Sequence, residues 1–436
     1  LRGRLSGHAA GGRFQLFVVG GGLLAVVGAA LFALSLRGEA ADRAWHLFHV
    51  NWLYFTGLAG GSVAIAAVHK IVKAKWSGVV LRFAEAAVAF FPVSLLGLVL
   101  IFTLGYDHIY GPMQEQLRSM AHAKALWLSK PWMFGRLLVG LSALYYLGWR
   151  LIRADLLPDI ADTAGQAEGA RRARYDRMLA GFDNSESGRA AHEARLHRLA
   201  PLYAATYAMV FTMVAFDGIM ALQPHWFSNL LGGFYFMGSF LGAHMLLALT
   251  VMYAGTQTGV WHLISPKQRH DLGKLCFGFT VFWAYLMFAQ FLVIWYGNLP
   301  EETGFVFARL WGTWLPIGRA VFLGMFLIPF IGLLGVGPKK FPGTMALFAT
   351  VSLVALWLER YLLVMPSVTA LDGPTFGLPE LGPTLLMAGL FFLAYGLFAR
   401  AFPMVSPRLA EITVTAERHH AVEDHFDHDE KANDFL

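Results

Sequence analysis

Ionisable side chains lie inside several segments of the sequence that are otherwise apolar. A charged group in such a segment is costly to place in a membrane, so each one is a candidate functional residue. The residues form two groups by their position along the segments, and each group contains a carboxylate and a histidine that could exchange protons. Near one end lie His49, Asn51, Arg136, Asp217, Arg319, Glu359 and Arg360, and near the other lie His69, Arg82, Glu85 and His244.

Asp217 is the strongest candidate of the first group, because no cation lies within four positions of it along the chain. His49 and Asn51 occur at a comparable depth. If these three side chains converge, they could relay protons. Together with Tyr54 they could instead bind a quinol and accept its protons. A structural alternative is that Asp217 caps the backbone beside Gly218.

Glu85 and His244 are the candidates of the second group. Arg82 precedes Glu85 by three residues, so the two side chains can neutralise each other on one helix face. Two interpretations are therefore open for Glu85: a local ion pair, or a proton acceptor that faces the cytoplasm.

Arg319 and Glu359 lie on consecutive antiparallel segments, and their depths differ by about four residues, or ~6 Å at the rise of an α-helix. Two long side chains can bridge that distance. We predict an ion pair between them, with a role in a proton path as the alternative.

The elements that carry these residues are membrane-spanning helices. The chain of 436 residues is 57% hydrophobic and only 14% charged, with a mean hydropathy of +0.53. About 20 apolar residues suffice for a helix to cross a bilayer. The strength of the apolar runs and their Gly content favour helices over a membrane β-barrel, so we expect an all-α integral membrane protein with ten spans. The expected spans are 15–36, 47–69, 78–104, 132–152, 199–222, 226–256, 274–297, 309–335, 343–365 and 380–402.

The distribution of Lys and Arg predicts the orientation. With ten spans, the N-terminus, the even-numbered loops and the C-terminus share one side, and that side holds most of the 34 basic residues. Basic loops stay in the cytoplasm, so we predict that both termini are cytoplasmic and that the first group of ionisable residues is in the outer half of the membrane. This topology accounts for the net charge of +6, which therefore gives no indication of nucleic-acid binding.

A short internal similarity suggests two repeats. Residues 54–57 (YFTG) and 235–238 (YFMG) occur at matching places in the second and sixth spans. We predict two parallel four-helix bundles, helices 2–5 and 6–9, with helices 1 and 10 at the periphery. The expected units are 1–46 (the cytoplasmic N-terminus and helix 1), 47–222 (the first bundle, with a cytoplasmic linker at 153–198), 223–365 (the second bundle), 366–402 (helix 10) and 403–436 (a cytoplasmic tail rich in His and acidic residues).

No cofactor or metal is predicted in this chain. Cys276 is the only cysteine, which excludes an intrachain disulfide, a thiolate iron–sulfur site and a C-x-x-C-H haem attachment. His69 and His244 lie at unequal depths, which disfavours a bis-histidine haem. The tail sequence ERHHAVEDHFDHDE could bind a metal, although a flexible charged terminus is the favoured interpretation.

Two strings carry a resemblance to a known family. They are FWAYLMFAQFLVIWYGNLPEET, at 282–303, and FDGIMALQPHWFSNLLGGFYFMG, at 216–238. Together with the ten spans, they make the chain similar to the ActF-type subunits of bacterial alternative complex III, within the wider family of NrfD and polysulfide-reductase membrane subunits. The resemblance extends from the first to the tenth span and omits the tail. In the first string, we expect Asn298 to be the N-cap of a turn that begins at Pro300.

The resemblance implies a location in the bacterial inner membrane and a complex that oxidises quinol and reduces cytochrome c or a related carrier. Haem c and iron–sulfur clusters would belong to partner subunits, and quinol would be the substrate of the complex. The implied partners are the sister subunit ActC, an iron–sulfur subunit, multihaem and monohaem cytochromes c, membrane lipid and, in some complexes, a terminal oxidase.

The family's quinol site is in ActC, whereas ActF-type subunits are described both as quinone-binding and as carrying a proton path. We therefore expect a non-catalytic subunit that supports assembly and conducts protons through Asp217, His49, Glu85, His244, Glu359 and Arg319. The alternatives are a quinol-binding subunit that uses His49, Asn51, Tyr54 and Asp217, a secondary transporter, and a purely structural anchor.

Overall fold

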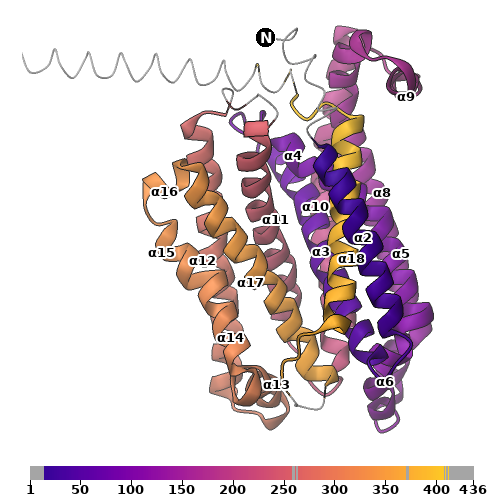
Figure 1. The fold of residues 1–436 in the computed structure, drawn as a ribbon, viewed down its shortest axis with the longest axis vertical. Helices are drawn as coiled ribbons and strands as arrows, with labels where there is room; N and C mark the ends of the chain where they lie inside the picture. The colour runs from indigo at the N-terminus through magenta and orange to yellow at the C-terminus, as the bar shows by residue number, and fades with distance from the viewer. Residues whose placement is uncertain are drawn as a thin grey trace, which may run out of the picture.

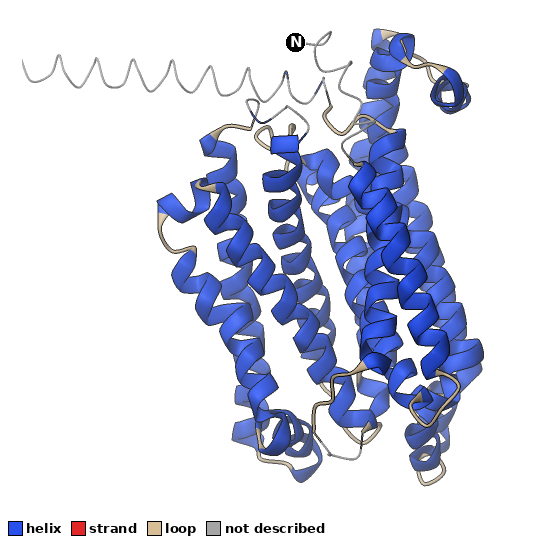
Figure 2. Ribbon diagram, in the orientation of Figure 1, coloured by secondary structure: helices blue, strands red, loops and turns tan. Residues whose placement is uncertain are grey.

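The computed structural model describes residues 14–257, 261, 264–369, 373–406, 408 and 411, and for residues 254–257 only the backbone. This part of the chain is helical and contains no strand (Figure 2). The longest helices stand side by side in one bundle (Figure 1). They are α2 (Gln15–Ser35), α3 (Ala41–Ile71), α8 (Lys130–Thr163), α10 (Glu186–Gly218), α11 (Leu230–Gln257), α12 (Pro266–Gly297), α17 (Pro342–Val368) and α18 (Leu378–Ala401).

Shorter helices complete two further spans and the connections. One span, Leu81–Leu117, combines α4 (Leu81–Glu85), α5 (Phe91–Leu100) and α6 (Tyr106–Leu117) through a 3₁₀ turn and a π turn. The other, Gly312–Gly332, contains α14 (Leu315–Phe322) and α15 (Ile328–Gly332). The remaining helices are α7 (His122–Trp127), α9 (Gly169–Leu179), α13 (Pro300–Leu310) and α16 (Val336–Lys340).

Within the described residues, nine helices are long and apolar enough to cross a membrane. The expected fourth span, 132–152, is the difference from the sequence-based count of ten. It lies within α8, which has the length to span but is less apolar than the other nine because Arg136 and a pair of tyrosines interrupt its leucines. An all-α, multi-pass membrane protein is thus confirmed.

The central helix is α3, which is buried along nearly its whole length. It packs against α10, α11, α17 and α18, while α2 packs mainly on α18. Glycines allow α3 and α11 to approach closely: a Cβ atom added at Gly61 would lie 2.7 Å from the carbonyl oxygen of Ser239. Gly57 meets the Ser239 side chain in the same way. Gly57, the glycine of the YFTG sequence, therefore lies at the α3–α11 contact, where small residues allow membrane helices to pack tightly.

Glycines also permit the close contact of α2 with α18, so a larger side chain there is expected to lower the stability. A Cβ atom at Gly28 would lie 2.2 Å from the backbone nitrogen of Leu386. We expect Gly28→Leu to lower the free energy of unfolding by about 1–3 kcal/mol, because the two backbones must separate. The midpoint of thermal unfolding in detergent measures this effect. Gly22→Leu is the control on the same helix, since a Cβ atom there meets nothing within 4 Å; equal shifts for both variants would contradict the prediction.

The polar end of the FWAYLMFAQFLVIWYGNLPEET string forms a helix-to-helix corner. Asn298 is not an N-cap, as predicted, but ends α12 in the left-handed conformation, with φ of 47°. The backbone N–H of Asn298 donates to the carbonyl oxygen of Ile294. Leu299 is the N-cap of α13, Pro300 is its first residue, and two glutamates follow in the first turn. Acidic residues at this end are favourable for the helix dipole.

Candidate functional site

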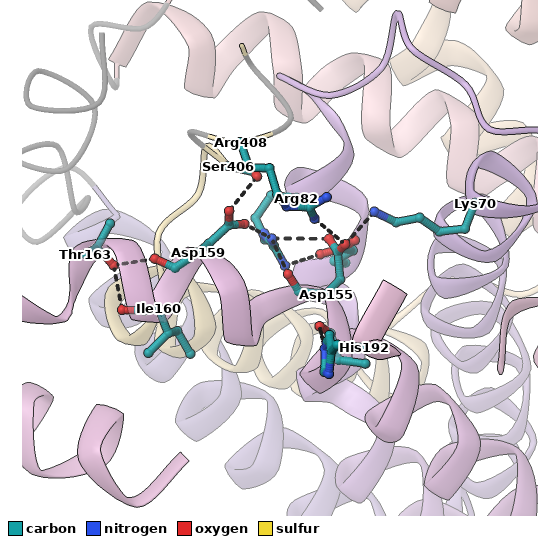
Figure 3. A network of polar contacts seen from close by, with 11 residues as sticks. Lys70, Arg82, Asp155, Asp159, Ile160, Thr163, His192, Ser406 and Arg408 are labelled. Atoms are coloured by element: carbon teal, nitrogen blue, oxygen red, sulfur yellow. Dashed lines mark hydrogen bonds and ion pairs between the residues drawn. The ribbon is translucent and has the colours of Figure 1, made fainter. Parts of the chain in front are cut away.

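A buried ionic network, which we name the inner cluster, joins α3, α4, α8 and the segment after α18. Arg82 is its centre (Figure 3). One Arg82 nitrogen, Nη1, pairs with Glu85, and the other, Nη2, lies 2.6 Å from Oδ2 of Asp159 and 3.3 Å from Oδ2 of Asp155. One guanidinium group thus pairs with three carboxylates. The cluster consists of Lys70, Arg82, Glu85, Asp155, Asp159, Ser406 and Arg408.

Two further cations complete the inner cluster. Nζ of Lys70 lies 2.5 Å from Oδ1 of Asp155, and Nη2 of Arg408 lies 3.2 Å from the same atom. Three cations therefore face three carboxylates. Lys70, Arg82 and Arg408 thus surround the Asp155 carboxylate with positive charge.

Glu85 and Asp155 each have one carboxylate oxygen that accepts no hydrogen bond from a described residue, Oε1 and Oδ2. The other oxygen of Glu85, Oε2, pairs with Arg82. The carboxyl group also lies beside that of Asp155. Two neighbouring carboxylates disfavour each other's ionisation, so the pair of Glu85 and Asp155 can bind a proton. The predicted Arg82–Glu85 pair is confirmed. The Oε1 atom of Glu85 is also compatible with the second interpretation, a proton acceptor that faces the cytoplasm.

A second buried group, which we name the outer cluster, surrounds Asp217 and consists of His49, Tyr110, Arg136 and Asp217. Arg136 on α8 binds the Asp217 carboxylate with two nitrogens, Nε at 2.7 Å from Oδ2 and Nη2 at Oδ1. His49 Nε2 lies 2.7 Å from the carbonyl oxygen of Gly218, and the hydroxyl of Tyr110 donates to the carbonyl of Asp217 at 3.0 Å. His49 thus lies beside the backbone that follows Asp217, but no described hydrogen bond joins its imidazole to the Asp217 carboxylate.

Asn51 and Tyr54 do not join that cluster. The amide of Asn51 donates to the hydroxyl of Thr384 at 3.0 Å and accepts from Nε1 of Trp357 at 2.9 Å. The hydroxyl of Tyr54 donates to the carbonyl of Leu353 at 3.0 Å. Both residues thus face α17 and α18, away from Asp217. The four quinone-binding candidates therefore do not form one site. His49 and Asp217 lie on one side of α3, whereas Asn51 and Tyr54 face the other side.

Three hydroxyl groups form a chain in the middle of α3, α5 and α8, at a depth between the two clusters. Oγ of Ser94 lies 2.5 Å from Oγ1 of Thr56 and 2.6 Å from Oη of Tyr145. Nε1 of Trp52 donates to the carbonyl of Ser94 at 2.8 Å, and the ring of Trp52 stacks with that of His49. All three hydroxyls can donate and accept, so they can pass a proton along. Sequence reasoning missed them because hydroxyl residues are common in apolar segments.

The predicted Arg319–Glu359 pair is not formed. Glu359 pairs instead with its neighbour Arg360 and accepts from Nε1 of Trp283 at 3.3 Å. Arg319 is exposed on the surface of α14. Arg360 in turn contacts Ser239 of α11 at 3.2 Å. Depth in the membrane does not specify which side of a helix a residue faces.

A small cavity of about 100 Å³ lies beside Glu359 and is also lined by Trp283, Gln290 and Arg309. Gln290 of α12 thus lines a mostly apolar cavity. Arg309 is buried and donates to the carbonyls of Phe305 and Leu363, while its Nε has no hydrogen-bond partner among the described residues.

The remaining histidine candidates are engaged locally. His244 Nδ1 lies 2.9 Å from the carbonyl of Phe240, one turn earlier on α11, and His69 Nδ1 lies 2.8 Å from the carbonyl of Ile65. No described contact links His244 to Glu85. The His-rich part of the tail lies outside the described residues, and no group of three or more potential metal ligands occurs among those that are described.

A comparison of the chain with protein-family models and with curated proteins finds no match.

Proposed function

We propose that this chain is an NrfD-like, ActF-type membrane subunit of a quinol-oxidising complex, alternative complex III, that supports assembly and conducts protons between the inner and outer clusters. The observation that carries the proton-path proposal is the chain of hydroxyls at Thr56, Ser94 and Tyr145, buried between two clusters of acids and bases. The two sequence strings carry the family assignment.

The proposed path starts at Glu85, whose free carboxylate oxygen is at the inner end. From Glu85 to Ser94 the chain advances nine residues, or about 14 Å at helical rise, and the proposal requires water molecules to bridge that distance. Trp52 packs between Ser94 and His49, but an indole N–H only donates, so water must also join the hydroxyl chain to His49, whose Nε2 lies at the carbonyl of Gly218 beside Asp217. His49 is the proton-accepting side chain on this route, and Arg136 lies at its outer end.

The arrangement in the membrane belongs to the same proposal. We place α3, α4–α6, α8 and α10 in one four-helix bundle and α11, α12, α14–α15 and α17 in the other, with α2 and α18 at the periphery. Both termini then lie on the cytoplasmic side of a bacterial inner membrane. The proposed proton path runs through the first bundle alone. In this arrangement α8 is the tenth span, although its apolarity is lower than that of the other nine.

The burial of His49 and Asp217 favours this function over a quinol site at the same residues. Their side chains are 1% and 0% exposed, and the described polar contacts of both are to protein atoms. A quinol head would have to displace Arg136 to reach the Asp217 carboxylate. Partner subunits would carry the haem c and the iron–sulfur clusters.

Tyr145→Phe tests the hydroxyl chain. In the purified complex reconstituted in liposomes, we expect the ratio of protons released per electron to fall while the rate of electron transfer stays the same, because only the proton-carrying oxygen is removed. Tyr207→Phe is the matched control, since that buried hydroxyl donates to the carbonyl of Phe236 at 2.8 Å and is not part of the path. If both variants keep the wild-type ratio, the hydroxyl chain conducts no protons.

A further inference from the structure

A large apolar groove lies on one side of the bundle. It has a volume of about 770 Å³. Helices α2 and α18 form one wall and α11 and α17 form the other, while α3 contributes the floor through Tyr54, Phe55 and Leu58. Figure 1 shows α2 and α18 side by side and α17 apart from them. Apart from α3, little connects the two walls.

The groove lies at the depth of the hydrocarbon core. Its lining residues come from the middle or the inner half of five helices that are long and apolar enough to span the membrane. Lining residues of α2 include Leu16 and Leu24, and those of α11 lie between Leu246 and Tyr253. Because lipid tails surround the protein at this depth, an apolar molecule of the bilayer can reach the groove without crossing water.

The polar side chains around the groove are already satisfied within the protein. Tyr54 donates to the carbonyl of Leu353, and Trp357 donates to Asn51. The hydroxyl of Thr250 donates to the carbonyl of Leu246, one turn earlier. A ligand with carbonyl or hydroxyl groups, such as a quinone ring, would therefore leave its polar atoms without partners, which costs free energy. A plain hydrocarbon chain has no such groups.

An alkyl chain is narrow and can follow the space along the α3 floor.

From these observations we infer that the groove binds an acyl chain of a membrane phospholipid, which fills the space between the α2–α18 pair and the α11–α17 pair. Because the chain moves from one apolar environment to another, van der Waals contacts with the groove walls hold it there. The lipid would then act as a structural component that joins the two walls across α3.

Photolabelling in the native membrane tests this inference. Cells that produce the full-length protein are grown with a fatty acid bearing a diazirine near its end, which they incorporate into phospholipids. After irradiation, the labelled residues of the chain are mapped by mass spectrometry. We expect labels on Tyr54, Phe55 and Leu58, which line the groove and are only 9%, 7% and 3% exposed. Labels confined to outward residues such as Leu23 and Val26 would overturn the inference.

A pair of variants makes the test specific. A side chain at Gly20 points into the groove, where an added Cβ meets only Leu16 at 4.0 Å, while Gly22 on the same helix does not line the groove and has nothing within 4 Å. We expect Gly20→Phe to reduce labelling of α3 at least threefold and Gly22→Phe to leave it unchanged.

Two further outcomes would overturn the inference. If α3 is labelled equally in both variants, the label does not arrive through the groove. If α3 is unlabelled in the wild-type membrane, another occupant, such as a partner's helix or an isoprenoid tail, fills the space. A thermal-unfolding measurement on both variants checks that the fold is intact.

Discussion

Replacing Arg82 by methionine is expected to lower the free energy of unfolding by about 3–5 kcal/mol or more, because it leaves buried carboxylates without their central cation. Arg82 is 1% exposed and contacts Glu85, Asp155 and Asp159. Lys70 and Arg408 remain, but both contact only Asp155 among these three acids. We expect Arg82→Lys to be intermediate, since an ammonium group cannot serve three carboxylates in the fixed geometry of a guanidinium.

Thermal unfolding in one detergent, followed by tryptophan fluorescence, measures this loss. Arg172→Met is the control, because Arg172 and Asp176 form an exposed pair on α9 whose removal should cost under about 1 kcal/mol. If Arg82→Met unfolds at the temperature of the control, the inner cluster is not the ionic core that the structure describes.

Arg136→Leu is expected to have the next largest effect, about 3–5 kcal/mol, because Asp217 would be left as an unpaired charge in the membrane. Asp217 is 0% exposed, and both of its carboxylate oxygens bind Arg136. Arg136 also stacks over the ring of Trp127, at 4.2 Å from its centre, but Trp127 is exposed and contributes less.

The double variant Arg136→Leu/Asp217→Leu isolates the pair. Removing both charges takes away the cost of the unpaired carboxylate, so we expect the double variant to be more stable than Arg136→Leu alone. The same thermal-unfolding assay compares the stability of the two single variants with that of the double variant. Additive destabilisation by the two substitutions would show that the pair is not an energetic unit.

Local patterns explain what the sequence could predict. The spans follow from runs of apolar residues, and the Arg82–Glu85 pair follows from a spacing of three on one helix. Asp217 and Arg136 are 81 positions apart, so their contact depends on how α8 and α10 pack, which no local pattern specifies. Asp155 and Asp159 were assigned to a cytoplasmic linker because charged residues surround them, yet α8 continues to Thr163 and buries both.

Rotation about the helix axis explains the main error. Arg319 and Glu359 lie at similar depths, which suggested a pair, but Arg319 faces outward on α14 and Glu359 inward on α17. The apolar residues of α17 are distributed too evenly for the sequence to define an inward face, whereas α14 is amphipathic and Arg319 lies on its polar side. The same uniformity hid the separation of Asn51 and Tyr54 from His49, since all three lie on α3, which is buried on every side.

The proton-to-electron ratio of the complex carrying Glu85→Gln tests the proton path most directly. Glutamine preserves an oxygen for Arg82, which is also held by Asp155 and Asp159, so the fold and assembly should be retained. It cannot, however, take up and release a proton at neutral pH. In the reconstituted complex, we predict that electron transfer from quinol continues while the number of protons moved per electron falls. An intact complex with an unchanged ratio would contradict a proton path through this chain.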